Sequence, residues 1–195
     1  MNTSALPESH PLTPFLPQQA QLLMLDSFPP PKARWSIDFY YPNFQNDMWR
    51  ILGDVFFSDK EYFIVPETRC FDKDKIILFC KDKGIALFDT ASVVRRLNAN
   101  ASDKFLEIVE PTDIIALLKH IPLCRNIVVT GQKAADTLTS TLHCDTLAVG
   151  DSVSLTIPDR ELTVWRMPSS SRAYPLSFDR KADAYRNLFR QIGML

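Results

Sequence analysis

The feature that most constrains the fold of this chain is a series of short, mostly apolar segments separated by stretches with helical periodicity. The predicted strands are residues 20–25, 84–88, 126–131 and 162–167. The predicted helices are residues 48–57, 72–83, 114–118, 132–142 and 177–192. Apolar strands that alternate with helices are typical of a mostly parallel sheet that is covered on both faces. We therefore predict an α/β fold, namely a three-layer α/β/α sandwich with a mostly parallel central sheet.

Two local patterns refine this prediction at the element boundaries. Residues 110–113 open the third helix, and Thr112 is a candidate N-cap because its hydroxyl can accept a hydrogen bond from a backbone N–H of the first turn. Residues 146–157 alternate in the manner of an edge hairpin, with a turn near Gly150-Asp151. We therefore expect a hairpin at one edge of the sheet.

The length and composition favour a single folded domain. The chain has 195 residues, of which 46% are hydrophobic and 23% are charged, so it can bury a substantial core. Residues 1–19 are rich in Pro, Ser and Thr, and neither an internal repeat nor a second shift in composition follows. We therefore predict an irregular N-terminal arm over residues 1–19 and one domain over residues 20–195.

The net charge of −1 argues against a protein that coats nucleic acid through a general positive charge, although a local basic face is compatible with it. The four cysteines form no C-x-x-C pair, and no spacing of Cys and His resembles a zinc site. The chain shows neither the pattern of a signal peptide nor an apolar run of membrane-spanning length. We therefore expect a cytoplasmic monomer that uses no metal, no other cofactor and no membrane.

Unusual sequences follow the predicted strands, at the position where ligands bind in open α/β sheets. These segments are Asp26–Pro31, Asp89–Thr90, Thr130–Gly131 and Met167–Arg172. Because the carboxyl ends of parallel strands meet at one edge of a sheet, we expect a binding site at that edge.

The loop before the first helix and the turn after the last strand carry the polar groups of this expected site. Tyr40 and Tyr41 lie in a predicted loop, and loops lie at protein surfaces, so we expect these rings to be accessible. Asn46 either caps the helix that follows or serves the site. The hydroxyls and backbone amides of Ser169–Ser171 can bind phosphate, and Arg172 can neutralise one, although an ordinary serine-rich turn has the same composition.

Five segments occur in an order that resembles the uracil-DNA glycosylase superfamily. The segments are Leu25–Pro29, Phe39-Tyr40-Tyr41 followed after four residues by Asn46-Asp47-Met48-Trp49, Gly84–Asp89, Val129–Ala134, and Met167–Ser171. The likeness covers about residues 20–193. It is closest to the branch that removes hypoxanthine and uracil, and next to the mismatch-specific thymine and uracil glycosylases. Five motifs in order are more specific than any one of them, and they imply a uracil-DNA glycosylase-like fold.

What the resemblance implies is a monofunctional DNA glycosylase of base-excision repair. Such an enzyme binds DNA that contains a damaged base, flips the nucleotide out of the stack, and hydrolyses the N-glycosidic bond of a deaminated base such as uracil or hypoxanthine. Positive charge develops on the sugar, as in other glycoside cleavage. A metal is unnecessary, because the base can leave as a stabilised anion.

The resemblance places two residues in catalytic roles. Asn46 matches the Asn that positions water or stabilises the transition state in the hypoxanthine-removing branch. The mismatch-specific branch carries such an Asn at the end of the first strand, where this chain has Phe28, which cannot orient water. Asp26 occupies a position that is usually Gly. Its carboxylate would stabilise the developing cation, or else it caps the proline-rich loop through local backbone bonds.

The remaining matched positions imply contacts with the base and with the DNA backbone. Tyr41 corresponds to the aromatic residue that stacks on the flipped base, and Phe28 is assigned to the same base-binding site. Thr130 corresponds to an Asn that reads the base edge, and it offers one hydroxyl in place of an amide. The DNA-binding positions are Ser169, Ser170, Ser171 and Arg172. The serines would hold the phosphates that flank the lesion, and the arginine would fill the gap left by the extruded nucleotide.

Two other functions remain open at this point. The sequence departs from the family pattern at Phe28, Pro30, Asn43-Phe44 and Thr130. These departures are compatible with a catalytically inactive relative that binds DNA or a nucleotide. An unrelated hydrolase with a serine nucleophile ranks last, because the chain has no G-x-S-x-G elbow. A serine nucleophile also needs a base. His10 lies in the arm, and His120 and His143 follow helices at the end away from the expected site.

Overall fold

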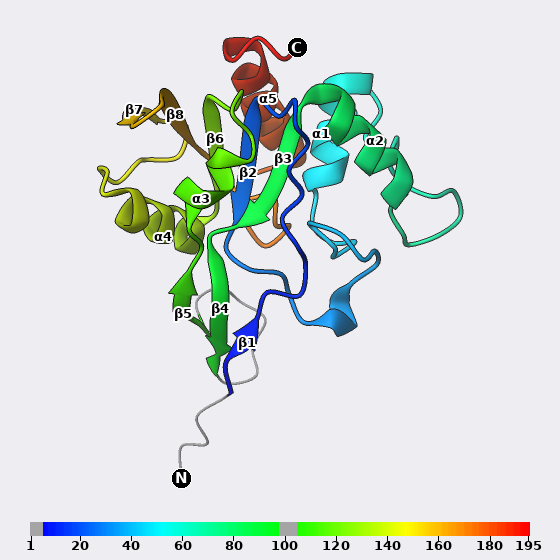
Figure 1. Cartoon of the computed structure of the whole chain (residues 1–195). Helices are drawn as coiled ribbons and strands as arrows, with labels where there is room; N and C mark the ends of the chain where they lie inside the picture. The colour runs from blue at the N-terminus through cyan, green and yellow to red at the C-terminus, as the bar shows by residue number, and fades with distance from the viewer. Residues whose placement is uncertain (1–5, 98–104) are drawn as a thin grey trace.

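A computed structural model describes residues 6–97 and 105–195 of the chain. Its centre is a five-stranded sheet in the order β3-β2-β6-β8-β7 (Figure 1). In chain order, the strands are β2 (Leu22–Asp26), β3 (Ile85–Asp89), β6 (Asn126–Thr130), β7 (Ser152–Ile157) and β8 (Arg160–Met167). Strands β3, β2, β6 and β8 are parallel, and β7 pairs with β8 in antiparallel fashion. The predicted mostly parallel sheet is therefore confirmed.

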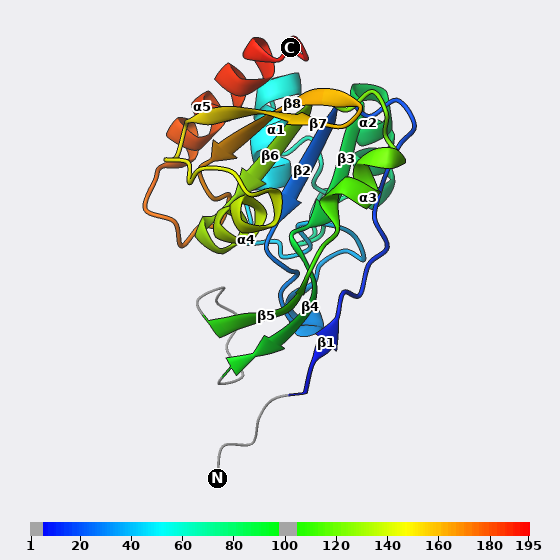
Figure 2. The ribbon, with the colours of Figure 1, turned by 60° about the vertical axis from the view of Figure 1, so that its left-hand side comes forward.

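Helices cover both faces of this sheet (Figures 1 and 2). One face carries α1 (Met48–Phe57), α2 (Lys73–Lys83) and α5 (Phe178–Gln191), and the other carries α3 (Ile114–Lys119) and α4 (Gln132–Leu142). Phe56 of α1 connects the three helices of the first face. Its ring packs edge to face against Phe79 of α2 and Phe189 of α5, with centroid distances of 5.1 Å and 4.8 Å. The predicted three-layer sandwich is thus confirmed. None of the helices in the described ranges is long and apolar enough to cross a lipid bilayer.

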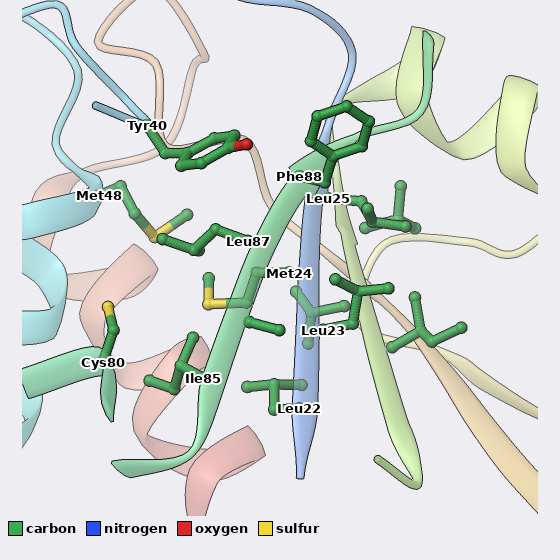
Figure 3. Close-up of a cluster of buried hydrophobic side chains, with 14 of the residues drawn as sticks. Leu22, Leu23, Met24, Leu25, Tyr40, Met48, Cys80, Ile85, Leu87 and Phe88 are labelled. Carbon is green, nitrogen blue, oxygen red and sulfur yellow. The ribbon is translucent and has the colours of Figure 1, made fainter. Parts of the chain in front are cut away.

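The central strands form because their side chains are buried on both faces. Leu22–Leu25 of β2 are fully buried. Figure 3 shows Met24 on the side of Met48 and Cys80, while Leu23 points to the opposite face of the sheet. A strand whose side chains are all apolar is stable only where both faces are covered, and this is why the apolar pattern alone predicts these strands.

A second, smaller sheet lies beyond the carboxyl ends of the central strands (Figure 2). Its strands are β1 (Glu8–Ser9), β4 (Ala91–Arg96) and β5 (Leu106–Pro111), which pair in the antiparallel order β1-β4-β5. Only Thr90 separates β4 from β3, so the small sheet grows directly out of the central one. The sequence pattern does not predict β4 and β5, because charged residues interrupt both strands and most of their side chains stay partly exposed.

The N-terminal arm is more regular than predicted. Residues 1–5 of the predicted arm lie outside the described residues. Glu8–Ser9 pair with β4, and Phe15 forms an isolated antiparallel bridge with Leu87 of β3. These two pairings, which are invisible in the local sequence, fix the arm against both sheets.

The predicted cap of the third helix is wrong by one residue. Asp113 is the N-cap of α3, and its carboxylate accepts a hydrogen bond from the backbone N–H of Ala116 at 2.9 Å. The Thr112 hydroxyl instead donates to the backbone oxygen of Asp89 at 2.8 Å. Residues 110–111, which we expected to open the helix, end β5. Thr112 therefore anchors the junction between the two sheets.

The predicted edge hairpin is also displaced along the chain. Strand β7 pairs with β8 from Ser152 opposite Trp165 to Ile157 opposite Arg160. The turn near Gly150 precedes this hairpin instead of forming its tip. The predicted alternation is present in β7, but its partner is β8, which follows it in the chain and also pairs with β6 in the central sheet.

Gly84, which ends α2, generates a test of the packing between this helix and the sheet. Its φ of 66° is left-handed, and an added Cβ would lie 2.8 Å from the backbone oxygen of Gln19. We expect Gly84→Ala to lower the free energy of unfolding by about 2–4 kcal/mol in urea titrations. Gly193→Ala is the matched control, since Gly193 has a φ of 72° with nothing within 4 Å. It should cost about 1–2 kcal/mol. Equal losses for the two variants would show that the contact with Gln19 relaxes freely.

Candidate functional site

The predicted site residues converge on one pocket beyond the carboxyl ends of the strands. The pocket has a volume of about 440 Å³, which lies within the range of small-molecule sites. Seven of the nine predicted residues line it, namely Asp26, Phe28, Tyr41, Asn46, Ser169, Ser171 and Arg172. The other two, Thr130 and Ser170, are buried and do not line it. Segments that are far apart in sequence therefore meet around a single cavity.

The loop before α1 and the serine turn after β8 are joined through their backbones. The backbone N–H of Asp47 donates to the backbone oxygen of Ser170 at 2.9 Å, and Asn46 forms an antiparallel bridge with Ser171. The Nε of Arg172 donates to the Asp47 carboxylate at 2.8 Å. These contacts fix the separation of Asn46 and the serine turn across the pocket.

Asn46 has a local structural role as well as a place in the pocket. Its Oδ1 accepts a hydrogen bond from the backbone N–H of Met48 at 2.9 Å. Asp47, the N-cap of α1, makes no side-chain capping hydrogen bond to the backbone of the helix, so Asn46 supplies the acceptor there. Within the described residues, no partner is found for the amide nitrogen of Asn46. A side-chain amide combines one acceptor with two donors, so Asn46 can bind the helix through its oxygen and present N–H groups to the pocket.

A buried lysine of α5 supports the serine turn. The Nζ of Lys181 donates to the backbone oxygen of Ser171 at 2.7 Å, and Lys181 is only 2% exposed. Burial lowers the pKa of this ammonium, and the charge of Arg172 lowers it further. The Oγ of Ser170 is buried and has no hydrogen-bond partner in the described part of the chain. Ser169 and Ser171 therefore face the cavity from a rigid turn, whereas Ser170 does not.

The two tyrosines of the loop are buried, contrary to our expectation that a loop would expose them. Tyr40 is 3% exposed and Tyr41 is 8% exposed. The Trp49 indole N–H donates a hydrogen bond to the backbone oxygen of Tyr40. The Tyr40 hydroxyl donates to the backbone oxygen of Thr13. The loop is thus folded inward by its own aromatic side chains. Tyr41 lines the pocket with a left-handed φ of 47°.

The Tyr41 hydroxyl lies near Thr130, which does not line the pocket. Burial raises the pKa of Tyr41 well above its usual range, and the charges of Asp26 and Asp89 act in the same direction. The nearby Thr130 hydroxyl lowers it slightly, although neither hydroxyl makes a hydrogen bond of good geometry with a described group. The Tyr41 phenol therefore stays neutral, and it offers the pocket a ring surface rather than an acid or a base.

Two carboxylates lie together at the pocket, of which the sequence motifs identified one. Asp26 and Asp89 are in register on neighbouring parallel strands, and both line the cavity. The Oδ1 of Asp89 accepts the backbone N–H of Asp26 at 3.2 Å, and the Oδ1 of Asp26 accepts the backbone N–H of Ser27 at 2.8 Å. Asp26 and Asp89 each follow directly on a predicted strand, residues 20–25 and 84–88, and this equal position is the signal that brings Asp89 beside Asp26.

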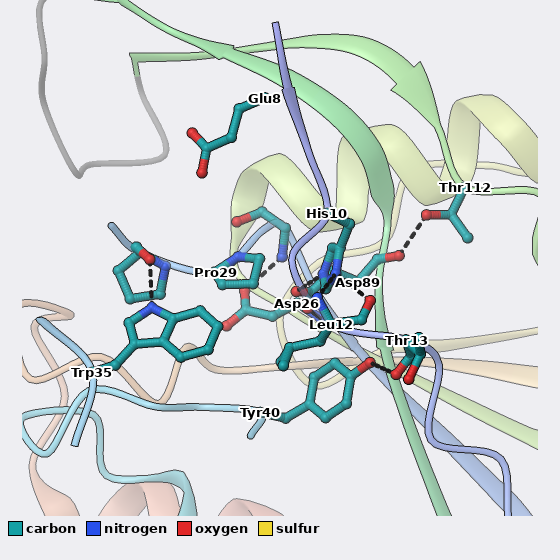
Figure 4. A network of polar contacts seen from close by, with 12 residues as sticks. Glu8, His10, Leu12, Thr13, Asp26, Pro29, Trp35, Tyr40, Asp89 and Thr112 are labelled. Atoms are coloured by element: carbon teal, nitrogen blue, oxygen red, sulfur yellow. Dashed lines mark hydrogen bonds and ion pairs between the residues drawn. The ribbon is translucent and has the colours of Figure 1, made fainter. Parts of the chain in front are cut away.

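Asp89 is also bonded to a histidine that the sequence placed in an irregular arm. The Nε2 of His10 lies 2.9 Å from the Oδ2 of Asp89 (Figure 4). The two side chains are 4% and 6% exposed. Seventy-nine positions separate the pair along the chain, and no local motif reveals such a contact. The arm therefore reaches the residues of the pocket.

Phe28 connects the pocket to the second sheet. Its ring packs in a small apolar cluster with Ala91, Val94 and Leu106. The Arg96 guanidinium lies 5.5 Å from this ring and donates to the backbone oxygen of Pro29 at 2.5 Å. The second sheet thus supports the loop that follows β2.

The rim of the pocket carries cations, whereas its lining carries carboxylates. Arg34 and Arg172 are exposed and line the opening. Among residues 6–97 and 105–195, no three His, Cys, Asp or Glu side chains are grouped to hold a metal ion. No described hydrogen bond joins the serine turn to a histidine, since His10 is bonded to Asp89 and Leu12. In the described part of the chain, the serine turn therefore lacks the histidine base that a serine nucleophile commonly uses.

Comparison with known proteins bears on the fold. No protein-family model matches the chain, and no curated protein matches it. Among solved structures, the chain is similar to a Methanosarcina acetivorans protein that was studied by solution NMR and provisionally assigned as a uracil DNA glycosylase. The TM-score is 0.64 and the sequence identity is 19%, over 96% of this chain and 99% of that chain. At this identity the likeness establishes architecture, and the chain therefore has a uracil-DNA glycosylase-like fold.

Proposed function

We propose that this protein is a monofunctional DNA glycosylase that hydrolyses the N-glycosidic bond of a flipped, deaminated base, uracil or hypoxanthine. The observation that carries the proposal is the convergence of seven of the nine site residues predicted from the sequence on one cavity of suitable size. A flipped base needs an aromatic surface, polar groups for its edge and cations for the adjoining phosphates. Tyr41 and Phe28, the two aspartates, and Arg172 with Arg34 supply these three features.

The chemical step would depend on electrostatics and orientation. Hydrolysis passes through a sugar with oxocarbenium character, which a nearby carboxylate stabilises. Asp26 lines the pocket and is suited to this role. Asn46 would hold the attacking water through its amide, whose orientation the bond to Met48 fixes in advance. An amide has no useful pKa, so its contribution would be positioning rather than proton transfer.

Recognition of the base is better assigned to Asp89 than to Thr130. Thr130 is buried beside the Tyr41 hydroxyl and does not line the cavity, whereas Asp89 does. Uracil and hypoxanthine both present a ring N–H, and an ionised carboxylate can only accept hydrogen bonds. Asp89 would therefore accept the ring N–H of a deaminated base.

A catalytically inactive relative that binds DNA is the second candidate. The observation that favours it is the hydrogen bond that already occupies the Asn46 oxygen. Phe28 also removes a polar side chain from the end of β2, where it belongs to an apolar cluster. Such a protein would bind lesion-containing DNA through the same pocket and rim without cleaving it.

A panel of duplexes, each with a single uracil or hypoxanthine, separates these two functions. We expect the wild-type protein to release at least one of these bases. Asn46→Ala should lower kcat/KM on the order of 10²-fold, as the loss of one transition-state donor does elsewhere. Asn46→Asp keeps an acceptor for Met48 but loses the N–H donors, so it should lose as much activity with a smaller loss of stability.

Asn43→Ala is the matched control for this series. Asn43 lines the same pocket, and its Oδ1 accepts a local bond from the backbone N–H of Gln45 at 2.9 Å. We expect kcat/KM of this variant to stay close to that of the wild type. Retention of full activity by Asn46→Asp would exclude the amide donors from catalysis. No release of either base at stoichiometric enzyme would leave the inactive binder as the function.

The rim generates a prediction about salt dependence. Arg172 is half exposed and lines the pocket, and only its Nε is bonded to Asp47, so its two terminal guanidinium nitrogens can contact a phosphate. Arg172→Ala should weaken duplex binding equally for lesion and undamaged DNA, and reduce the slope of log K against log salt concentration by about 1. Arg125→Ala is the control, because Arg125 precedes β6 and so lies at the amino-terminal ends of the parallel strands, away from the pocket. Fluorescence anisotropy across a salt series measures both, and identical slopes for the two variants would count against a phosphate contact at Arg172.

A further inference from the structure

We propose that His10 is a positioning residue that holds Asp89 as an oriented carboxylate, and so gives the pocket its preference for deaminated bases over cytosine and adenine. This inference rests on the proposed function and adds a residue from outside the family-matched motifs. It makes the N-terminal arm part of the recognition site, although none of the described arm residues 6–19 lines the pocket.

The first support is the hydrogen bonding of the Asp89 carboxylate. A buried carboxylate needs hydrogen-bond donors, because removal of its hydration is otherwise costly. Asp89 receives one from the backbone of Asp26 at 3.2 Å and one from the Nε2 of His10 at 2.9 Å. Of these, only the His10 bond comes from a side chain and is short. Since a carboxylate has about four lone-pair sites, the acceptors that remain can serve the cavity.

The second support is the fixed position of the His10 ring. The backbone N–H of His10 donates to Ser92 at 2.8 Å, immediately after the β1 pairing. Its Nδ1 lies 2.9 Å from the backbone oxygen of Leu12 and 3.1 Å from the backbone nitrogen of the same residue. Both ring nitrogens therefore have partners, and the Nε2 atom is directed at Asp89 (Figure 4).

Aromatic rings enclose the same imidazole. Its centroid lies 4.5 Å from that of Phe88, 5.1 Å from that of Phe28 and 6.3 Å from that of Tyr40. This surrounding is apolar and excludes water, which strengthens the remaining hydrogen bond. Two of the three rings, Phe28 and Tyr40, also line the pocket. His10 and the pocket thus share a wall.

The state of Asp89 decides which base edge fits the pocket. Uracil and hypoxanthine carry a hydrogen on the ring nitrogen that is unprotonated in cytosine and adenine. An ionised carboxylate accepts that N–H, but it repels the lone pair of the parent base. A protonated carboxyl group would instead donate to the lone pair and accept from the amino group of the parent base. A donor that holds the Asp89 carboxylate in one orientation toward the ring nitrogen therefore favours deaminated bases.

Binding to uncleavable DNA tests the inference separately from catalysis. The probes are duplexes with one 2′-fluorinated uridine or cytidine opposite guanine, since the fluorine opposes charge on the sugar. We expect wild-type protein to bind the uridine duplex more tightly, as judged by fluorescence anisotropy. His10→Phe keeps a ring but loses the donor, and it should reduce this preference about tenfold, because a hydrogen bond to a charged group is lost. His10→Gln retains an N–H at a similar place and should keep most of the preference.

A double-mutant cycle with Asp89→Asn identifies the path of the effect. If His10 acts through Asp89, His10→Phe should change the preference less than twofold in the Asp89→Asn background. An equal effect in both backgrounds, an unchanged preference in His10→Phe, or no preference in the wild-type protein would each overturn the inference. Urea unfolding of every variant establishes that it is folded, and NMR of the wild-type His10 Nε2–H gives a reading that needs no variant of His10. We expect a slowly exchanging signal that Asp89→Asn shifts, and its absence would also contradict the inference.

Parallel cleavage assays on unmodified uridine DNA keep the two proposals apart. Preferential binding without cleavage would refute the glycosylase and leave the role of His10 intact. Cleavage without a preference in binding would support the glycosylase and refute the role of His10.

Discussion

The pocket depends on the contact between the loop before α1 and the serine turn after β8. Neither segment belongs to the sheet, and 125 positions separate Asp47 from Arg172. The bond from Asp47 to Ser170 and the bridge between Asn46 and Ser171 hold them together. Lys181 reinforces the turn from α5, and a buried ammonium cannot give up its acceptor without a large cost. A helix outside the pocket therefore fixes the width of the cavity.

Charge is distributed in opposite senses over the lining and the rim. Asp26 and Asp89 make the lining negative, while Arg34 and Arg172 make the rim positive. A negative interior suits a sugar that acquires positive charge, but it repels phosphates, which must stay outside. The net charge of −1 is therefore compatible with DNA binding, because only the rim has to attract the backbone. In the proposed glycosylase, this polarity would favour a single extruded nucleotide over a deeply inserted strand.

The sequence predicts the features that depend on local pattern and misses those that depend on distant pairing. Apolar runs identify β2 and β6, because covered strands are apolar on both sides. The partly exposed β4 and the contact of His10 with Asp89 depend on partners far along the chain. The motifs also place Ser170 in the pocket, whereas successive side chains of an extended segment point in opposite directions. Ser169 and Ser171 can therefore line the cavity only when Ser170 turns away.

The apolar Phe28, which follows β2, and the polar Asn46, which precedes α1, are related through the packing of the pocket. Phe28 packs on Val94 and Leu106, so its position belongs to the core of the second sheet. An asparagine there would bury its amide among apolar groups without a partner, at a cost of about 1–3 kcal/mol. In the proposed glycosylase, a side chain that orients water would then come from another part of the lining. Asn46 also lines the pocket, and its bond to Met48 orients the amide.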